Sequence, residues 1–141
     1  MNAQATPQQL IEQARARYAL QWLQESLRKE GLKGSELKSY TRRLPAMIRI
    51  NGFGQAVAFY RARATKSAAY KAVYQLVEDW LCGKDQANPR PIYSQGQDLM
   101  TEITRCDQER YRLAQAETQA LMQWAKKFVE AMIVEDDAHD S

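Results

Sequence analysis

The adjacent acidic residues Glu78 and Asp79 come closest, of all side chains in this chain, to a catalytic arrangement. A nuclease of the two-metal type holds its ions with several carboxylates. Neighbouring residues on a helix point about 100° apart, however, and no second acidic cluster with a regular spacing joins this pair. The single histidine, His139, lies close to the end of the sequence. We therefore expect no enzymatic activity, and we keep a divalent-metal nuclease built on Glu78 and Asp79 as the enzymatic alternative.

Neither the glycines nor the cysteines form a cofactor motif. The segment Gly52-Phe53-Gly54 lacks the lysine and the spacing of a phosphate-binding loop. Cys82 and Cys106 have no partner at CxxC spacing, so we expect no zinc site and no other metal or cofactor. Both thiols are expected to be reduced and buried rather than bridged.

The charges of the chain are segregated along the sequence. Between Leu37 and Val77 there are eight Lys or Arg residues and no Asp or Glu, so this basic window carries +8. The whole chain carries +3, and the remaining residues together carry −5. A segregated basic patch is typical of a protein that binds a polyanion. We predict that nucleic acid is bound by seven cations of this window: Lys38, Arg42, Arg43, Arg49, Arg61, Arg63 and Lys66.

The length and composition favour one soluble domain. A chain of 141 residues with 45% hydrophobic residues is long enough to bury a core. No apolar run approaches the roughly 18 residues that cross a bilayer, so we expect no membrane partner. The first residues, MNAQATPQQ, lack the features of a secretory signal, which favours a cytoplasmic protein. We expect a helical domain over residues 1–134, followed by an acidic, disordered tail over 135–141.

Hydrophobic periodicity predicts an all-α, compact bundle of five to six helices, without any strand alternation. Thr6, Pro7 and Gln9 form a capping-box pattern that starts the first helix, which Gly31 ends. Ser35 is the expected cap of the second helix. Pro45 lies inside that helix and predicts either a kink near Thr41 or a second start at Pro45.

The second helix is expected to carry a basic stripe on its outer side. On a helical wheel, Lys38, Arg42 and Arg49 fall within roughly 40° of one another. Solvated faces usually mix the two signs of charge, and this one does not. The opposite face is apolar and predicts a core-facing surface: Leu37, Tyr40, Leu44, Met47 and Ile48.

A tight corner at Asn51 and Gly52 is predicted to separate the second helix from a third over 54–63. Three cations lie at or just beyond the end of that helix: Arg61, Arg63 and Lys66. A cation there complements the helix dipole, which explains one of the three structurally but not all of them. Ser67 caps a fourth helix, and we interpret its aromatic residues as core rather than as base-stacking platforms. After a proline-containing connection, a short helix follows from Asp98 to Arg105.

Asp107 is predicted to cap a final helix over 108–133. Its small and apolar residues alternate spacings of four and three, which is suited to packing between antiparallel neighbours. The predicted seam consists of Ala114, Thr118, Leu121, Ala125, Phe128 and Met132.

The segments 39–48, SYTRRLPAMI, and 51–59, NGFGQAVAF, together resemble the signature of one family. This family is the small subunit of the Cmr complex, the type III-B CRISPR RNA-silencing effector. Phe53 stands where leucine is usual in that family. Residues 17–19, RYA, and several positions between 107 and 131 are similar to its flanking blocks, so that the match spans about 9–132.

The resemblance implies an all-helical, non-catalytic subunit of a ribonucleoprotein that serves antiviral defence. Copies would stack head to tail, beside other Cmr effector subunits, and would line the path of target RNA paired with the CRISPR guide RNA. The family contacts RNA through basic surface residues, and by position the resemblance implies Lys38, Arg42, Arg43, Arg49 and Arg61 as the candidates here. The alternative is a protein-only helical scaffold whose basic face docks an acidic partner subunit.

Overall fold

The computed structural model describes residues 6–94 and 97–134, and the expected acidic tail over 135–141 lies outside these ranges. The described residues contain no β-strand, which confirms the all-α prediction. None of their helices combines the length and the apolar character needed to cross a bilayer. In chain order the elements are α1 (Pro7–Leu27), α2 (Gly34–Asn51), α3 (Phe53–Arg63), α4 (Ala68–Leu81), the 3₁₀ helix η1 (Lys84–Gln86), α5 (Leu99–Arg105) and α6 (Gln108–Met132).

Polar side chains start most of these helices, as predicted. The Thr6 hydroxyl accepts the Gln9 N–H at 3.1 Å and the Gln9 side chain accepts the Thr6 N–H at 2.8 Å, which completes the capping box of α1. Ser67 and Asp107 cap α4 and α6 with their side chains, as predicted, and Asp98, expected as the first residue of its helix, caps α5 instead.

The expected cap at Ser35 is wrong. The carbonyl of Lys33 already accepts the Leu37 N–H at 3.0 Å, so α2 begins at Gly34 and Ser35 lies inside its first turn. Lys33 occupies the capping position without a side-chain bond, and α2 therefore starts without the stabilisation that a polar cap supplies.

Helix α2 continues through Pro45, so the alternative of a second start at that residue is also wrong. Proline has no N–H, so the Thr41 carbonyl lacks the helical hydrogen bond that residue 45 would otherwise donate. Pro45 is buried, and the side-chain amide of Gln119 in α6 donates to the Pro45 carbonyl at 3.1 Å, so α6 packs against this part of α2.

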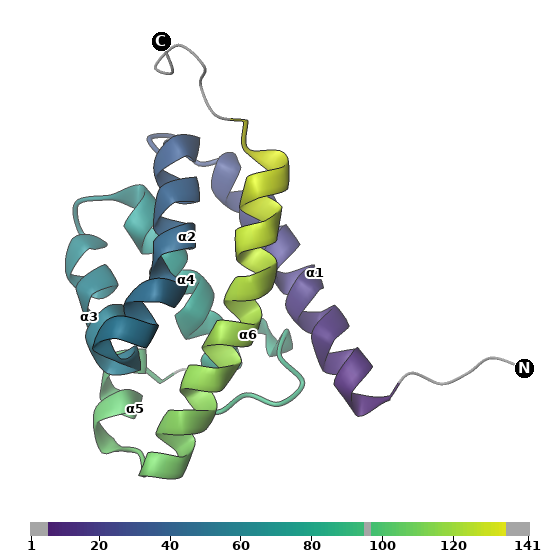
Figure 1. The fold of residues 1–141 in the computed structure, drawn as a ribbon, viewed down its shortest axis with the longest axis vertical. Coiled ribbons are helices and arrows are strands. Elements are labelled where there is room, and N and C mark those ends of the chain that lie inside the picture. Colours follow the sequence, from purple (N-terminus) through teal and green to yellow (C-terminus); the bar gives the residue numbers. More distant parts are fainter. Residues whose placement is uncertain (1–5, 95–96, 135–141) are drawn as a thin grey trace, which may run out of the picture.

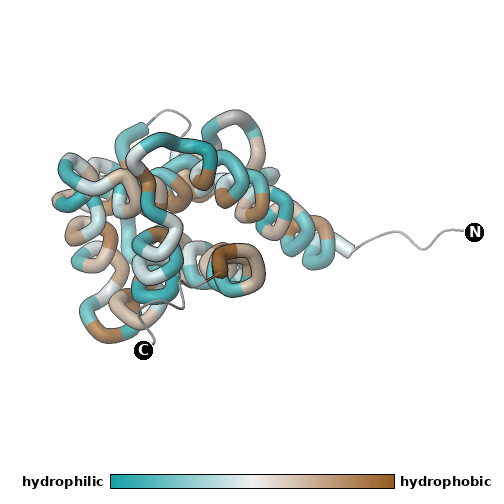
Figure 2. Tube along the Cα trace, turned by 90° about the horizontal axis from the view of Figure 1, so that it is seen from above, coloured by the Kyte–Doolittle hydropathy of each residue, from teal (hydrophilic) through white to brown (hydrophobic). Residues whose placement is uncertain are grey.

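The helices pack around α6 and α4. Figure 1 shows α2 beside α6, with α1 crossing behind α6, α3 on the far side of α2, and α5 below α2, near the start of α6. Lys38 of α2 contacts Ile133 and Pro45 contacts Gln119, so α2 and α6 are antiparallel. Seen from above, α1 projects away from the other helices toward its N-terminal end, and hydrophobic and hydrophilic segments alternate along it (Figure 2).

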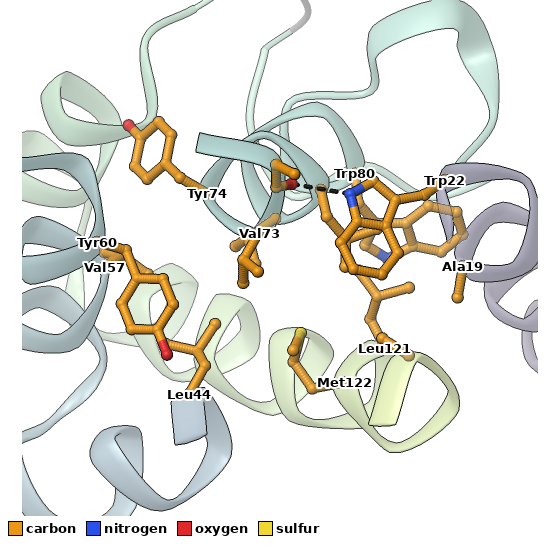
Figure 3. Close-up of a cluster of buried hydrophobic side chains, with 14 of the residues drawn as sticks. Ala19, Trp22, Leu44, Val57, Tyr60, Val73, Tyr74, Trp80, Leu121 and Met122 are labelled. Carbon is orange, nitrogen blue, oxygen red and sulfur yellow. Dashed lines mark hydrogen bonds between the residues drawn. The ribbon is translucent and has the colours of Figure 1, made fainter. Parts of the chain in front are cut away.

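The core lies where these helices meet. Figure 3 shows Tyr60, Val57 and Leu44 on one side of the core and Trp22 and Trp80 on the other. Val73 of α4 and Met122 of α6 lie between the two groups, and both are fully buried. The aromatic residues of α4, which are Tyr70, Tyr74 and Trp80, are all buried, which confirms that they belong to the core.

The seam of α6 is correct only in its first part. Ala114, Leu121 and Ala125 are fully buried, but Met132 is 44% exposed and Val129 takes the buried position instead. A strict alternation of four and three has a period of 3.5 residues, while a straight helix has 3.6. The resulting drift moves the buried face away from the predicted positions toward the end of the helix.

Candidate nucleic-acid interface

A glycine corner sets the angle between the two most basic helices. Gly52 has φ +89° and ψ 158°, a conformation that is essentially restricted to glycine, while Asn51 is still helical. The Gly52 N–H closes α2 by donating to the Ile48 carbonyl, and the Gly52 carbonyl opens α3 by accepting from Ala56. One residue therefore ends α2 and starts α3.

A tyrosine of α6 holds this corner in place. The Gly54 N–H donates to the Tyr111 hydroxyl at 2.7 Å, and the Tyr111 ring meets Phe53 edge-on at 5.6 Å. A Cβ at Gly54 would lie 3.2 Å from the Tyr111 hydroxyl, so a side chain there would crowd the bond that anchors α3. The glycines of the signature therefore serve the fold, and the cations near them are left for a surface role.

The stripe on α2 is less uniform than predicted. Lys38 is half-buried at the edge between α2 and α6, and its ammonium group donates to the Ile133 carbonyl at 3.1 Å. Arg42 and Arg49 are exposed, as expected for an outer surface. Lys38 therefore also ties the end of α6 to α2.

Arg43 lies on a different side of α2, beside α4. Its guanidinium donates from Nη1 to the Tyr70 hydroxyl at 2.9 Å and lies 5.3 Å from the centre of the Tyr40 ring. Tyr40 and Tyr70 stack with a centroid separation of 3.8 Å and an interplanar angle of 14°. The guanidinium is therefore held by two stacked rings, while the residue as a whole stays exposed.

Arg63, in the last turn of α3, packs on the same aromatic group. Its guanidinium carbon lies 3.5 Å from the centre of the Phe59 ring and 6.0 Å from that of Tyr70. Phe59 meets Tyr70 edge-on at 6.2 Å. We call Tyr40, Phe59 and Tyr70, with Arg43 and Arg63 upon them, the arginine–aromatic cluster.

Two other predicted cations lie apart from this cluster. Arg61 lies 5.9 Å from the centre of the Tyr74 ring and lines a hollow that it shares with Glu78 and Asp98. Lys66 is exposed in the turn between α3 and α4. The seven predicted cations therefore do not form one uniform surface. Lys38, Arg42 and Arg49 belong to the stripe on α2, Arg43 and Arg63 belong to the arginine–aromatic cluster, Lys66 lies in the turn after α3, and Arg61 lines the hollow at Tyr74.

Burial dominates the ionisation of the tyrosines beneath this surface. Burial, and to a smaller extent the charge of Glu36, raises the pKa of Tyr40. Burial also raises the pKa of Tyr60, whose hydroxyl donates to the Tyr40 carbonyl at 2.6 Å. These phenols are therefore neutral at physiological pH and act as hydrogen-bonding groups rather than as anions.

Glu78, considered above as a metal ligand, has a structural role in the described chain. Its carboxylate accepts the Leu99 N–H at 3.0 Å, the Tyr74 hydroxyl at 3.2 Å and the Gln75 amide at 3.0 Å. Within residues 6–94 and 97–134, no group of three or more His, Cys, Asp or Glu is placed to hold a metal ion. Both cysteines are free thiols, Cys82 buried and Cys106 half-buried.

The aromatic support of the arginines is the part of this surface that the sequence did not predict. Tyr40 and Tyr70 are thirty positions apart in the sequence, and helical periodicity assigns both to the core. Only the packing of α2 against α4 shows that their ring edges also support cations at the surface.

Comparisons with known proteins agree with this fold and with the signature. A search of curated proteins found no match. A solved structure, a CRISPR-associated Cmr5 family protein from Thermus thermophilus, is similar with a TM-score of 0.64 and 24% identity, over 87% of this chain and 96% of that one. Residues 11–132 match the family model described as CRISPR-associated protein (Cas_Cmr5). The chain therefore belongs to the Cas_Cmr5 family, the small subunits of the type III-B Cmr complex.

Proposed function

We propose that this protein is a non-catalytic, RNA-binding small subunit of a cytoplasmic CRISPR ribonucleoprotein. In this function, copies stack head to tail beside other Cmr subunits and support target RNA paired with the CRISPR guide RNA. The observation that carries the proposal is the acid-free basic window: its cations lie on α2, α3, α4 and the turn after α3, and these three helices pack against one another. Exposed cations without interspersed carboxylates neutralise phosphates without reading sequence.

This division of labour suits a machine that is programmed by a guide. Base pairing between guide and target supplies the sequence recognition, so that the protein needs to bind only the backbone and the shape of the duplex. A single copy then binds weakly, and many copies tethered along one strand bind strongly. The engagement of Glu78 by Leu99, Tyr74 and Gln75 supports the non-catalytic part of the proposal.

The test is a charge reversal in the reconstituted complex. Arg42→Glu combined with Arg49→Glu is expected to weaken target-RNA binding while the complex still assembles. Arg17→Glu combined with Arg112→Glu changes the charge equally, at two exposed positions outside the basic window, and serves as the matched control. Loss of assembly with the first pair alone would instead favour the protein-only scaffold that docks an acidic subunit.

Salt provides an independent test of the same proposal. Binding through phosphates releases counterions, so the affinity of the assembled complex should fall steeply as salt is raised. An affinity that is independent of salt would contradict binding through the RNA backbone.

A further inference from the structure

We propose that Arg43 and Arg63 form one composite site that binds a single backbone phosphate of the RNA. This inference rests on the proposed function and names the place where α2, α3 and α4 together bind the RNA strand. It differs from the stripe of Arg42 and Arg49, whose side chains are exposed on another side of α2.

The first reason is that one aromatic side chain positions both guanidinium groups. Tyr70 accepts a hydrogen bond from Arg43 at 2.9 Å, and its ring centre lies 6.0 Å from the guanidinium carbon of Arg63. Tyr70 itself is 7% exposed and is stacked against Tyr40, so it cannot move freely. Two cations from different helices are therefore held in place before a ligand arrives, which lowers the entropy lost on binding.

The second reason is that the contacts leave the hydrogen-bond donors available. Arg63 meets Phe59 at 3.5 Å, a cation–π contact that involves the face of the guanidinium and leaves its five in-plane N–H groups to other partners. Arg43 uses a single N–H on Tyr70. A guanidinium whose edge is free presents the planar fork that matches a phosphate.

The third reason is that no described carboxylate neutralises the two charges. In the described part of the chain, no carboxylate forms an ion pair with Arg43 or Arg63, whereas Arg15 pairs with two and Arg105 with one. Aromatic rings also displace water from one side of each cation. An unneutralised, partly dehydrated pair of guanidinium groups attracts an anion more strongly than a fully hydrated one.

A phosphodiester fits this site better than an acidic side chain does. Lys66 is exposed in the turn after α3, three residues beyond Arg63, so that a strand with regularly spaced charges meets a further cation. The non-bridging oxygens of each phosphodiester accept charge-assisted hydrogen bonds from guanidinium groups, and an RNA strand repeats this group at regular intervals, which a single acidic side chain does not. We therefore assign the ligand as RNA backbone, and docking of an acidic protein becomes an outcome of the test.

The experiment uses effector complexes reconstituted with variants of the full chain and measures assembly and target-RNA affinity. Arg43→Gln with Arg63→Gln should weaken RNA binding about tenfold or more, with a shallower salt dependence. Arg43→Lys with Arg63→Lys keeps the charge but loses the fork and the stacking, and should weaken binding by roughly threefold. Arg17→Gln with Arg112→Gln, which removes two exposed arginines elsewhere, should leave the affinity unchanged.

Two results would overturn the composite site. Wild-type affinity in the lysine pair would show that charge alone matters, and loss of assembly in the glutamine pair would show that the cluster docks a protein. If the glutamine pair binds normally while the reversal of Arg42 and Arg49 weakens binding, the composite site fails and the proposed function stands. If neither pair affects RNA binding, both proposals fail.

Discussion

Two regions of this molecule use arginine in opposite ways. At the junction of α1, α4 and α6, Arg15 donates from Nε and Nη2 to both oxygens of Glu117, at 2.7 and 2.8 Å. Glu12 accepts a third bond from Arg15 at 2.6 Å, and the Trp80 indole donates to Glu117 at 2.8 Å. In the arginine–aromatic cluster, the guanidinium groups instead lie on rings and have no carboxylate partner among the described residues.

The difference distinguishes Arg15, whose charge stabilises the fold, from Arg43 and Arg63, whose charges are available to a ligand. Arg15 is 11% exposed in its side chain, and its pKa is raised further, chiefly by the hydrogen bond to Glu117. Its guanidinium is engaged on two sides by carboxylates of the same chain, so it stabilises the fold and offers little to a ligand. Arg43 and Arg63 contribute less to the stability of the fold, and most of their N–H groups are available to a bound molecule. The predictions below test this contrast, in order of decreasing effect on stability.

Removing Glu117 should have the largest effect. Glu117→Ala leaves Arg15 charged and Trp80 without its acceptor in a partly buried site, and should lower the free energy of unfolding by about 3 kcal/mol. Glu12→Ala is the matched control, since its side chain is 43% exposed, and should lower it by less than about 1 kcal/mol. Urea unfolding measures both values, and equal losses would contradict the special role of the Glu117 contact.

A smaller loss is expected at the corner between α2 and α3. Gly52→Ala places a side chain at φ +89° and should cost about 1–3 kcal/mol of unfolding free energy. Gly34→Ala is the control: a Cβ there meets Ile133 at 3.5 Å, which is an ordinary contact, in a helical conformation. Thermal unfolding distinguishes the two, and similar melting temperatures would show that the corner tolerates a side chain.

Alkaline pH should weaken the fold gradually. Burial raises the pKa of the Cys82 thiol from its usual 9.0 to about 12, and burial also raises the pKa of Tyr60. Because folding raises the pKa of the Cys82 thiol, this thiol ionises at a lower pH in the unfolded chain than in the folded chain. Its contribution to the free energy of unfolding is therefore full below pH 9.0 and is lost as the pH rises toward 12. Chemical unfolding across this range should show a falling free energy, and Cys82→Ala should make the decline shallower. A free energy that rises across this range would contradict the assigned burial.

The smallest effect is expected where the arginines lie on rings. Arg63→Ala removes an exposed cation–π contact and should lower the free energy of unfolding by about 0.5–1 kcal/mol. Arg49→Ala, an exposed arginine without a described ring contact, should change it still less. A loss for Arg63→Ala as large as that for Glu117→Ala would mean that Arg63 is structural, and the contrast between the two regions would disappear.

Local signals in the sequence predicted most of the fold. The predicted caps at Thr6, Ser67 and Asp107 lie within three residues of the N–H groups whose hydrogen bonds they accept, and all three are confirmed. Errors arose where packing overrides local preference. Helix α2 continues through Pro45, which is buried and whose carbonyl accepts from Gln119 of α6, a packing contact that the sequence around Pro45 cannot indicate.

The candidate site was predictable as a set of charges but not as a geometry. The acid-free window is visible in the sequence, whereas Arg43 reaches Tyr70 across twenty-seven positions. The bond between Arg15 and Glu117 spans 102 positions, and only the tertiary structure identifies which arginine is neutralised. Sequence periodicity therefore separates buried from exposed faces but does not pair side chains across the bundle.

The positions of the three tryptophans make the fold observable by fluorescence and NMR. Trp22 is buried, and its indole N–H donates to the Ala72 carbonyl at 2.8 Å; Trp80 is fully buried. Trp124, on α6, is half-buried beside Phe128. The indole protons of Trp22 and Trp80 should therefore exchange slowly with solvent, while Trp124 is the tryptophan whose fluorescence a soluble quencher reduces. Loss of quenching at Trp124 would then report when another molecule covers that side of α6, without any introduced label.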